Sequence, residues 1–270
     1  MPISSNLPDS SVTVFEAGGV RIVDSGARLD VILCSPQNRN AQTPRMWEAL
    51  HGARAFVHDS IRVVVLSAEG ASFSAGFDRS MLGAPTAENP VTLASLGMSG
   101  EATLRDFITQ AQQAFTWWRH CDALTIAVVQ GHAIGAGFQL ALACDLMLAL
   151  PDASFAMRET RLGLVPDLGG THPLVRAVGY SRALEICATG REVLAPEALT
   201  LGIVQQVLSP KKLDTQIEEI LGALSSPSRG AVTDLKHLLR QAEDCDSAGQ
   251  LVNEREMQIR RINALMREAT

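Results

Sequence analysis

The stretch that decides the fold is Thr125–Asp145, with the sequence TIAVVQGHAIGAGFQLALACD. Its first five residues form an apolar, β-branched run that predicts a buried strand. Glycines at 131, 135 and 137 interrupt the run, and Phe138–Cys144 then has the apolar density of a buried helix. A strand that enters a helix through a glycine-rich turn leaves the first N–H groups of that helix unpaired. The turn is therefore suited to hold negative charge; alternatively, its glycines only let two backbones approach closely.

The spacing of these glycines argues against a nucleotide site. They fit neither G-x-G-x-x-G nor G-x-x-x-x-G-K-[ST], and no lysine follows them. A second turn of the same kind follows the apolar run Ile61–Leu66, in the segment SAEGASFSAGFD at 67–78, and a backbone N–H directly after Gly76 can be left free there. Two separate turns with one backbone donor each are the minimum needed to stabilise an enolate or a tetrahedral oxyanion.

Three segments together resemble the signature blocks of the crotonase superfamily, the enoyl-CoA hydratases and isomerases. They are SFSAGFD (72–78), GHAIGAGFQLALACDL (131–146) and RETRLGLVPDLGGTHPLVRAVG (158–179). The resemblance runs from about residue 12 to the C-terminal helices. It implies an α/β fold, a spiral of ββα units with a C-terminal helical region, that assembles as homotrimers or homohexamers. It also implies an acyl-CoA thioester substrate, with coenzyme A entering as part of the substrate and no further cofactor.

By this resemblance the oxyanion donors are the backbone N–H groups of Phe77 and Ala136, which would hold the thioester carbonyl. Their neighbours Gly76, Asp78 and Gly135 are expected to line the same substrate site.

The acids lie in the third block. In the hydratases of the family two glutamates flank the substrate double bond, and alignment of the glycines places Gln139 at the first position and Glu159 at the second. A glutamine amide can orient a water or hold a carbonyl, but it has no accessible pKa for moving protons. This departure counts against efficient hydration. One carboxylate is sufficient for isomerisation, in which a single base removes the proton α to the thioester and returns it at the γ carbon.

The role of Asp167 stays open at this point. Dienoyl-CoA isomerases of the superfamily carry a working aspartate there, so the resemblance implies a two-acid pair with Glu159. Alternatively, Asp167 caps the helix expected from Thr171 to Val178. His132 is a further candidate base, unless its side chain points away from the turn while its backbone forms it.

Composition excludes several classes. The chain has 270 residues, 46% of them hydrophobic, which predicts a globular protein with one large core or a main domain with a small appendage. A net charge of −6 without a basic run argues against nucleic acid or a membrane as partner. The N-terminus lacks the pattern of a secretion signal, so we expect a cytoplasmic location. The five scattered cysteines are expected to be reduced, and the histidines show no metal-ligand spacing, so no metal is expected.

The rest of the chain predicts an α/β core over 1–209 and a helical region over 210–270, divided at Ser209-Pro210. Met81–Gly100 is rich in glycine and proline, and we expect it to form a lid over an acyl chain or else a surface loop. Because coenzyme A is anionic, we consider Arg39, Arg79, Lys236 and the C-terminal arginines as contacts, although each can equally be a solvated charge. Expected strands are 12–15, 20–23, 29–34, 61–66, 125–129, 146–150, 154–156 and 203–207. Expected helices are 44–55, with Thr43 as its cap, 101–120, 138–144, 171–178, 180–189, 195–201, 213–224, 230–241 and 251–267.

These observations give a leading hypothesis and an alternative. The leading one is an acyl-CoA-transforming enzyme of the enoyl-CoA hydratase/isomerase type, with Glu159 as acid/base and Asp167 as a second catalytic acid. The alternative is a non-catalytic acyl-CoA-binding protein of the same fold, which would keep both backbone donors and use Gln139 only as a polar contact.

Overall fold

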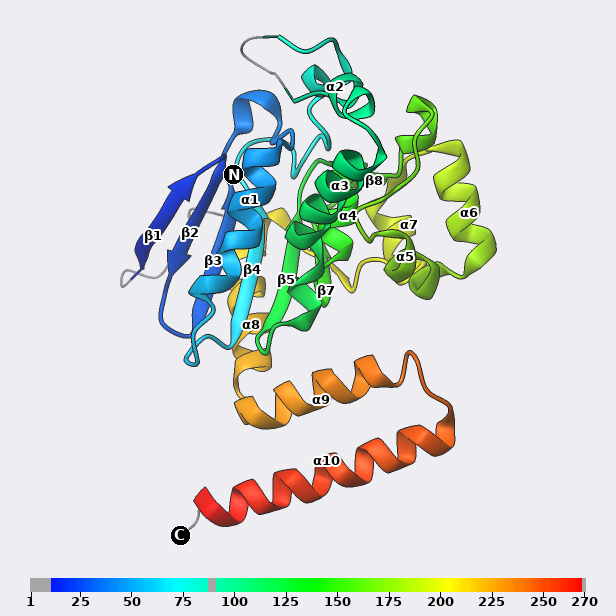
Figure 1. Cartoon of the computed structure of the whole chain (residues 1–270). Coiled ribbons are helices and arrows are strands. Elements are labelled where there is room, and N and C mark those ends of the chain that lie inside the picture. The colour runs from blue at the N-terminus through cyan, green and yellow to red at the C-terminus, as the bar shows by residue number, and fades with distance from the viewer. Residues whose placement is uncertain (1–10, 87–90, 269–270) are drawn as a thin grey trace.

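The structure is a computed structural model that describes residues 11–86 and 91–268 (Figure 1). Residues 1–10, where a secretion signal was considered, 87–90 of the expected lid, and 269–270 lie outside the described residues. Within the described part, no helix has the length and apolarity needed to span a bilayer.

A seven-stranded sheet in the order β1-β2-β3-β4-β5-β7-β10 forms the centre of the molecule. The first three strands pair antiparallel through tight turns, as the sequence predicts, and β3, β4, β5, β7 and β10 are parallel. The strands are β1 Val12–Ala17, β2 Val20–Asp24, β3 Arg28–Leu33, β4 Val63–Ala68, β5 Leu124–Val129, β7 Leu146–Ala149 and β10 Gln206–Val207. The fold is the expected α/β class, with a mostly parallel sheet.

Helices cover both faces of the parallel part of this sheet, which explains why its strands are continuous apolar runs. Alternate residues of β4 serve two cores. Val64 and Leu66 belong to the larger core under α1 and α3, whereas Val63 and Val65 meet the apolar face of α8 (Figure 1). The helices are α1 Pro44–Gly52, α2 Leu93–Met98, α3 Glu101–Thr116, α4 Ala136–Leu142, α5 Thr171–Val178, α6 Tyr180–Thr189, α7 Ala195–Thr200, α8 Leu213–Ser225, α9 Arg229–Gln241 and α10 Ser247–Glu268.

A second, three-stranded sheet lies beyond the carboxyl end of β5. It has the order β6-β8-β9, formed by His132–Ile134, Ser154–Ala156 and Val193–Leu194. Because β6 follows β5 after only two residues, the chain passes from the main sheet to the small one and then directly into α4. Short 3-10 helices join the larger elements: η2 Pro36–Asn38, η3 Ala53–Phe56, η4 Arg79–Leu82, η5 Trp118–His120, η6 Glu159–Leu162 and η7 Pro210–Lys212.

A buried ion pair attaches the C-terminal helices to this core. Lys236 of α9 is almost fully buried, and its Nζ lies 2.6 Å from Oδ2 of Asp145 and 2.8 Å from the carbonyl oxygen of Ala123. Thr125 donates its hydroxyl to the same carboxylate oxygen at 2.9 Å. The consideration of Lys236 as a coenzyme A contact is therefore wrong, because its ammonium group is used inside the fold.

Candidate active site

The first turn after β4 is held beside Gln42. The N–H of Gln42 donates to the carbonyl oxygen of Gly76 at 2.7 Å, and its carbonyl oxygen accepts from the N–H of Asp78 at 2.9 Å. These two bonds bracket Phe77. Successive groups of an extended chain point to opposite sides, so the N–H of Phe77 faces away from Gln42. Within residues 11–86 and 91–268 this N–H has no hydrogen-bond acceptor.

The second turn joins β6 to α4 through Gly135. This residue has φ +53° and ψ −118°, which a residue with a Cβ rarely adopts, and no side chain caps the helix. Ala136 is the first residue of α4, so its N–H has no carbonyl within the helix to bond, and no acceptor in the described part of the chain. The turn thus presents one free backbone donor, as does the first.

Ser74 and Gly76 bring the two turns together. The N–H of Ser74 donates to the carbonyl oxygen of His132 at 2.9 Å, and Ile134 returns a bond to the carbonyl oxygen of Ser74 at 3.0 Å. A Cβ on Gly76 would lie 3.4 Å from the nitrogen of Ala136. The residue that precedes Phe77 is therefore in contact distance of the second donor.

Glu159 places its carboxyl over the second turn. It is the first residue of η6, and Oε1 would lie 3.3 Å from a Cβ built on Gly135. Oε1 accepts a hydrogen bond of 2.7 Å from Nε2 of Gln139. Oε2 is buried and has no partner among the described residues. Burial raises the pKa of Glu159, and the negative charge of Asp167 raises it further, against hydrogen bonds from its own backbone and from Gln139.

Gln139 links Glu159 to the third block. Its side chain is buried, and its Oε1 accepts from the backbone N–H groups of Leu168 at 2.9 Å and Gly170 at 3.3 Å. Because the oxygen faces two donors, the amide nitrogen must face Glu159, and the orientation of the amide is determined. The amide oxygen is therefore engaged within the protein, and only one N–H of Gln139 remains for a water or a ligand.

Asp167 lies in the same loop, near enough for its charge to act on Glu159. The residue as a whole is exposed, but the surrounding loop partly buries its carboxyl and raises its pKa. Helix α5 begins at Thr171 with Gly170 as its N-cap and no side-chain cap. The alternative that Asp167 caps this helix is therefore wrong, because the loop residues 168–170 separate it from the first turn.

Two other candidates are used locally. Asp78 accepts the N–H of Ser80 at 2.9 Å and so caps η4, while its own N–H is bonded to Gln42. The side chain of His132 is exposed and its ring lies 3.5 Å from the hydroxyl of Ser72, whereas its carbonyl oxygen holds Ser74. The reading in which His132 serves the turn through its backbone agrees with this placement.

Sequence reasoning missed the roles of two polar side chains behind the first turn. Gln42 and Ser74 are fully buried, and a hydrogen bond of 3.3 Å joins the amide of Gln42 to the hydroxyl of Ser74. Asn40, also fully buried, bonds the carbonyl oxygens of Glu69 and Ser72 at 2.9 and 3.0 Å. Asn40 was not missed: with Ala41 it lies where the family resemblance places an Asn-Ala pair, and its φ of 52° is one that asparagine tolerates.

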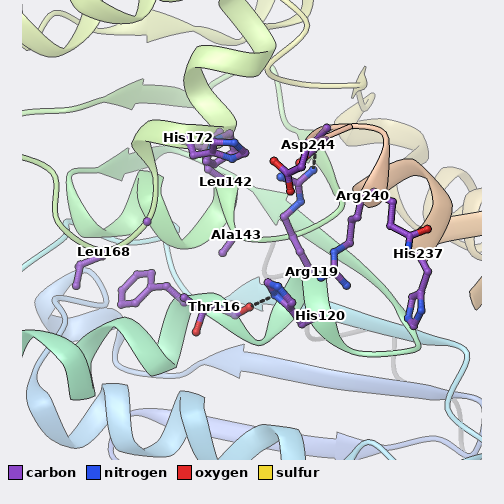
Figure 2. A pocket seen from close by; sticks show the side chains of 15 residues that line it. Thr116, Arg119, His120, Leu142, Ala143, Leu168, His172, His237, Arg240 and Asp244 are labelled. Carbon is purple, nitrogen blue, oxygen red and sulfur yellow. Dashed lines mark hydrogen bonds and ion pairs between the residues drawn. The ribbon is translucent and has the colours of Figure 1, made fainter. Parts of the chain in front are cut away.

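A cavity of about 480 Å³ is lined in part by Leu168 and Gly169 of the loop that holds Gln139 (Figure 2). Its walls come from the ends of α3, α4 and α9 and the start of α5. Charged side chains of both signs line it; the basic ones are Arg119, His120, His172, His237 and Arg240, and the acidic ones are Glu243 and Asp244. Leu168 and Gly169 belong to its lining, but Phe77, Ala136 and Glu159 do not. The cavity is therefore distinct from the cluster of donors and acids.

The model of the family described as enoyl-CoA hydratase/isomerase matches residues 29–268. The chain belongs to this family. A carnitinyl-CoA dehydratase from Salmonella arizonae is 33% identical over 230 residues, which are 83% of this chain and 81% of that protein. The peroxisomal Delta(3,5)-Delta(2,4)-dienoyl-CoA isomerase of Arabidopsis thaliana is 33% identical over 185 residues, 68% of this chain and 66% of that one.

Solved structures of the family agree with the fold. A Thermobifida fusca protein described as a candidate enoyl-CoA hydratase superposes with a TM-score of 0.88 at 38% identity, covering 93% of this chain and 95% of that one. The same protein in complex with acetoacetyl-CoA gives a TM-score of 0.86 at 38% identity, covering 92% and 96% of the two chains. Members of the enoyl-CoA hydratase/isomerase family thus include a similar chain with an acyl-CoA bound.

Proposed function

We propose that this chain is an enzyme that moves a proton next to the thioester of an acyl-CoA. The N–H groups of Phe77 and Ala136 hold the thioester oxygen as the enolate forms, and Glu159 carries the proton. The observation that carries the proposal is the position of the Glu159 carboxyl against Gly135, directly beside the Ala136 donor. A carbonyl oxygen held by that N–H has its α carbon close to the acid. The complex of a 38% identical protein with acetoacetyl-CoA supports this class of substrate.

The two oxygens of Glu159 have different roles in this proposal. Oε1 is held by Gln139, whereas Oε2 is buried without a partner in the described part of the chain. An unpaired buried oxygen is the better proton acceptor, because taking up a proton relieves its poor solvation. Oε2 therefore removes the α proton and returns it, while the bond to Gln139 keeps the carboxyl in place.

An isomerase fits these residues better than a strong hydratase. Hydration by paired carboxylates needs a second acid at position 139, where this chain has a glutamine whose oxygen is already engaged. Isomerisation needs only one carboxyl that takes and returns the same proton. Asp167, whose charge raises the pKa of Glu159, is proposed as a second acid when the proton must travel farther, as over a conjugated diene.

Substitution of Glu159 by glutamine tests the proposal against the acyl-CoA binder. We expect kcat for isomerisation of a 3-enoyl-CoA to fall about 10²- to 10⁴-fold, the usual contribution of a general acid/base. The affinity for acetoacetyl-CoA should change less than about threefold, because the amide keeps the shape of the carboxyl. Glu101→Gln, at a side chain that is 85% exposed on α3, is the matched control. A wild-type chain that binds acyl-CoA but turns over neither 2-enoyl- nor 3-enoyl-CoA would establish the binder.

We further propose that the chain forms trimers or hexamers. Ile259 and Ile262 form an apolar stripe along α10. This stripe does not pack over the core, since the two side chains are 48% and 49% exposed. An exposed stripe of this kind is typical of a surface that a second subunit covers. Light scattering should give the mass of three or six chains, and Ile262→Glu should lower it; a monomeric wild-type protein would contradict the proposal.

A further inference from the structure

Behind the first turn lies a network of buried hydrogen bonds between side chains. Its members are Gln42, Ser74 and Trp47. We infer that this network is the positioning device that sets the N–H of Phe77 relative to the N–H of Ala136. The inference rests on the proposed function, in which these two N–H groups hold one oxygen.

Ser74 is the residue that is bonded to both turns. Its hydroxyl donates to the carbonyl oxygen of Asn40 at 2.7 Å and accepts from the N–H of Gly76 at 3.1 Å, which fixes the first turn. Its backbone exchanges hydrogen bonds with both ends of β6, which leads directly into Gly135 and Ala136. A shift of Ser74 would therefore move one donor relative to the other.

Gln42 holds the first turn through both its backbone and its side chain. Its backbone bonds the residues on either side of Phe77, and its side chain reaches Ser74 through Nε2 at 3.3 Å. Its Oε1 accepts from Nε1 of Trp47 at 2.9 Å. Trp47 lies in α1, and its ring stacks on that of Phe77 with centroids 5.9 Å apart and an angle of 30°. The side chain of Phe77 is thus held by the same residue that anchors Gln42.

The burial of these groups makes the network rigid. Gln42 and Ser74 have no exposed surface, and Trp47 is 5% exposed. A buried donor or acceptor that loses its partner must find another, so the turn would rearrange rather than remain in place. Oxyanion stabilisation depends on donors aimed at one point before the reaction begins. Loss of the network should therefore weaken catalysis although no substrate contact is removed.

The test uses Gln42→Met and Ser74→Ala, with acetoacetyl-CoA carrying ¹³C at its thioester carbonyl as the probe. Isotope-edited infrared spectroscopy reports how strongly the bound carbonyl is polarised. In the wild-type protein we expect the band to lie at lower frequency than in water. In both variants the band should move back towards its frequency in water. The kcat for isomerisation of a 3-enoyl-CoA should fall about 10- to 100-fold, which is less than for loss of a whole donor. KM should change less than about threefold.

Thr125→Val is the matched control. Thr125 is also fully buried, and its hydroxyl bonds Asp145 and the carbonyl oxygen of Trp118, near the end of β5 that lies away from the two turns. Its loss should lower the melting temperature without moving the carbonyl band. If Ser74→Ala does not fold, Trp47→Phe serves in its place; it removes the indole donor to Gln42 together with part of the ring that stacks on Phe77.

The outcomes separate the two proposals. Variants that lose stability as Thr125→Val does, but keep the wild-type band and kcat, would show that the network is merely structural and overturn the inference alone. An unshifted band in the wild-type protein would overturn the oxyanion hole itself, and with it the inference. A shifted wild-type band that moves back in Gln42→Met but not in Thr125→Val supports both.

Discussion

Replacing Gln139 by glutamate should place two carboxyl groups in direct contact. Oε1 of Gln139 accepts from two backbone N–H groups, and a glutamate oxygen can keep both bonds. The other oxygen would then take the position of Nε2, which lies 2.7 Å from Oε1 of Glu159. Two carboxylates at hydrogen-bond distance do not both ionise near neutral pH, so the pair should share one proton.

The structure sets the size of the effect. With charge centres about 4 Å apart and an effective dielectric constant of about 20, the repulsion is about 4 kcal/mol. This corresponds to about 3 pKa units at about 1.4 kcal/mol per unit. It adds to the burial and the charge of Asp167 that already raise the pKa of Glu159. The acid limb of the pH profile, which reports ionisation of the base, should therefore move upward by about 2 to 3 pH units.

The assay is kcat/KM for isomerisation of a 3-enoyl-CoA and for hydration of a 2-enoyl-CoA, measured from about pH 4 to about pH 9. In Gln139→Glu, isomerisation should fall on the acid side, and the ratio of hydration to isomerisation should rise once the pair holds a single proton. Gln139→Met loses the hydrogen bond without adding a charge, so its acid limb should move by less than about one unit. A glutamate variant whose limb stays within about half a unit of wild type would refute the reasoning, since residue 139 would then not be coupled to Glu159.

Three further predictions follow from the same contacts. Asp167→Asn should move the acid limb to lower pH, because the charge of Asp167 raises the pKa of Glu159; an unchanged profile would count against that coupling. Because the pKa of Glu159 is raised by folding, ionisation of this group costs stability as the pH rises from its unfolded pKa through its folded one. Glu159→Gln should therefore have a higher free energy of unfolding in urea than wild type at pH values above that window. Below the window the substitution should bring no such increase. Lys236→Met should cost about 3 to 5 kcal/mol by leaving the charge of Asp145 buried, and adding Asp145→Asn should restore part of the loss; equal urea midpoints for Lys236→Met and wild type would contradict this.

Most elements of the fold could be predicted from the sequence, because long apolar runs and helical spacing are local signals. The decisive stretch gives β5 and α4 as expected, and Thr43 caps α1 at Pro44. The short strand β6 could not be predicted, since three residues carry no periodicity and are a strand only because β8 lies beside them. The strand expected at 203–207 is shorter in the structure. Only Gln206–Val207 form a strand, because these two residues pair with β7. The expected lid contains a short helix, α2, whose capping box begins at Thr92.

The candidate site was less accessible from the sequence. The spacing of the glycines indicates two turns with free donors, and the family resemblance names Phe77 and Ala136, but no pattern shows that the turns meet. Gln42 is a single polar residue before a helix, so nothing local distinguishes it from a solvated side chain. Its burial arises from α1 packing over the first turn, through Trp47. Lys236 was considered as a coenzyme A contact because its sequence neighbours do not show that it is paired. Its partner Asp145 is 91 residues away in the chain.

The two free donors belong to the main chain, and this has a consequence for how the sequence can vary. Exchange of the residue at 77 or 136 alters a side chain but leaves an amide hydrogen in place, provided that the residue is not proline. Selection can therefore diversify those positions without removing the amide hydrogens that we propose hold the thioester carbonyl. Positions 139 and 159 have no such protection, since there the side chain itself would act and one substitution changes the chemistry. We therefore expect a change of reaction type to arise at a few acidic and amide positions, around backbone donors that tolerate mutation.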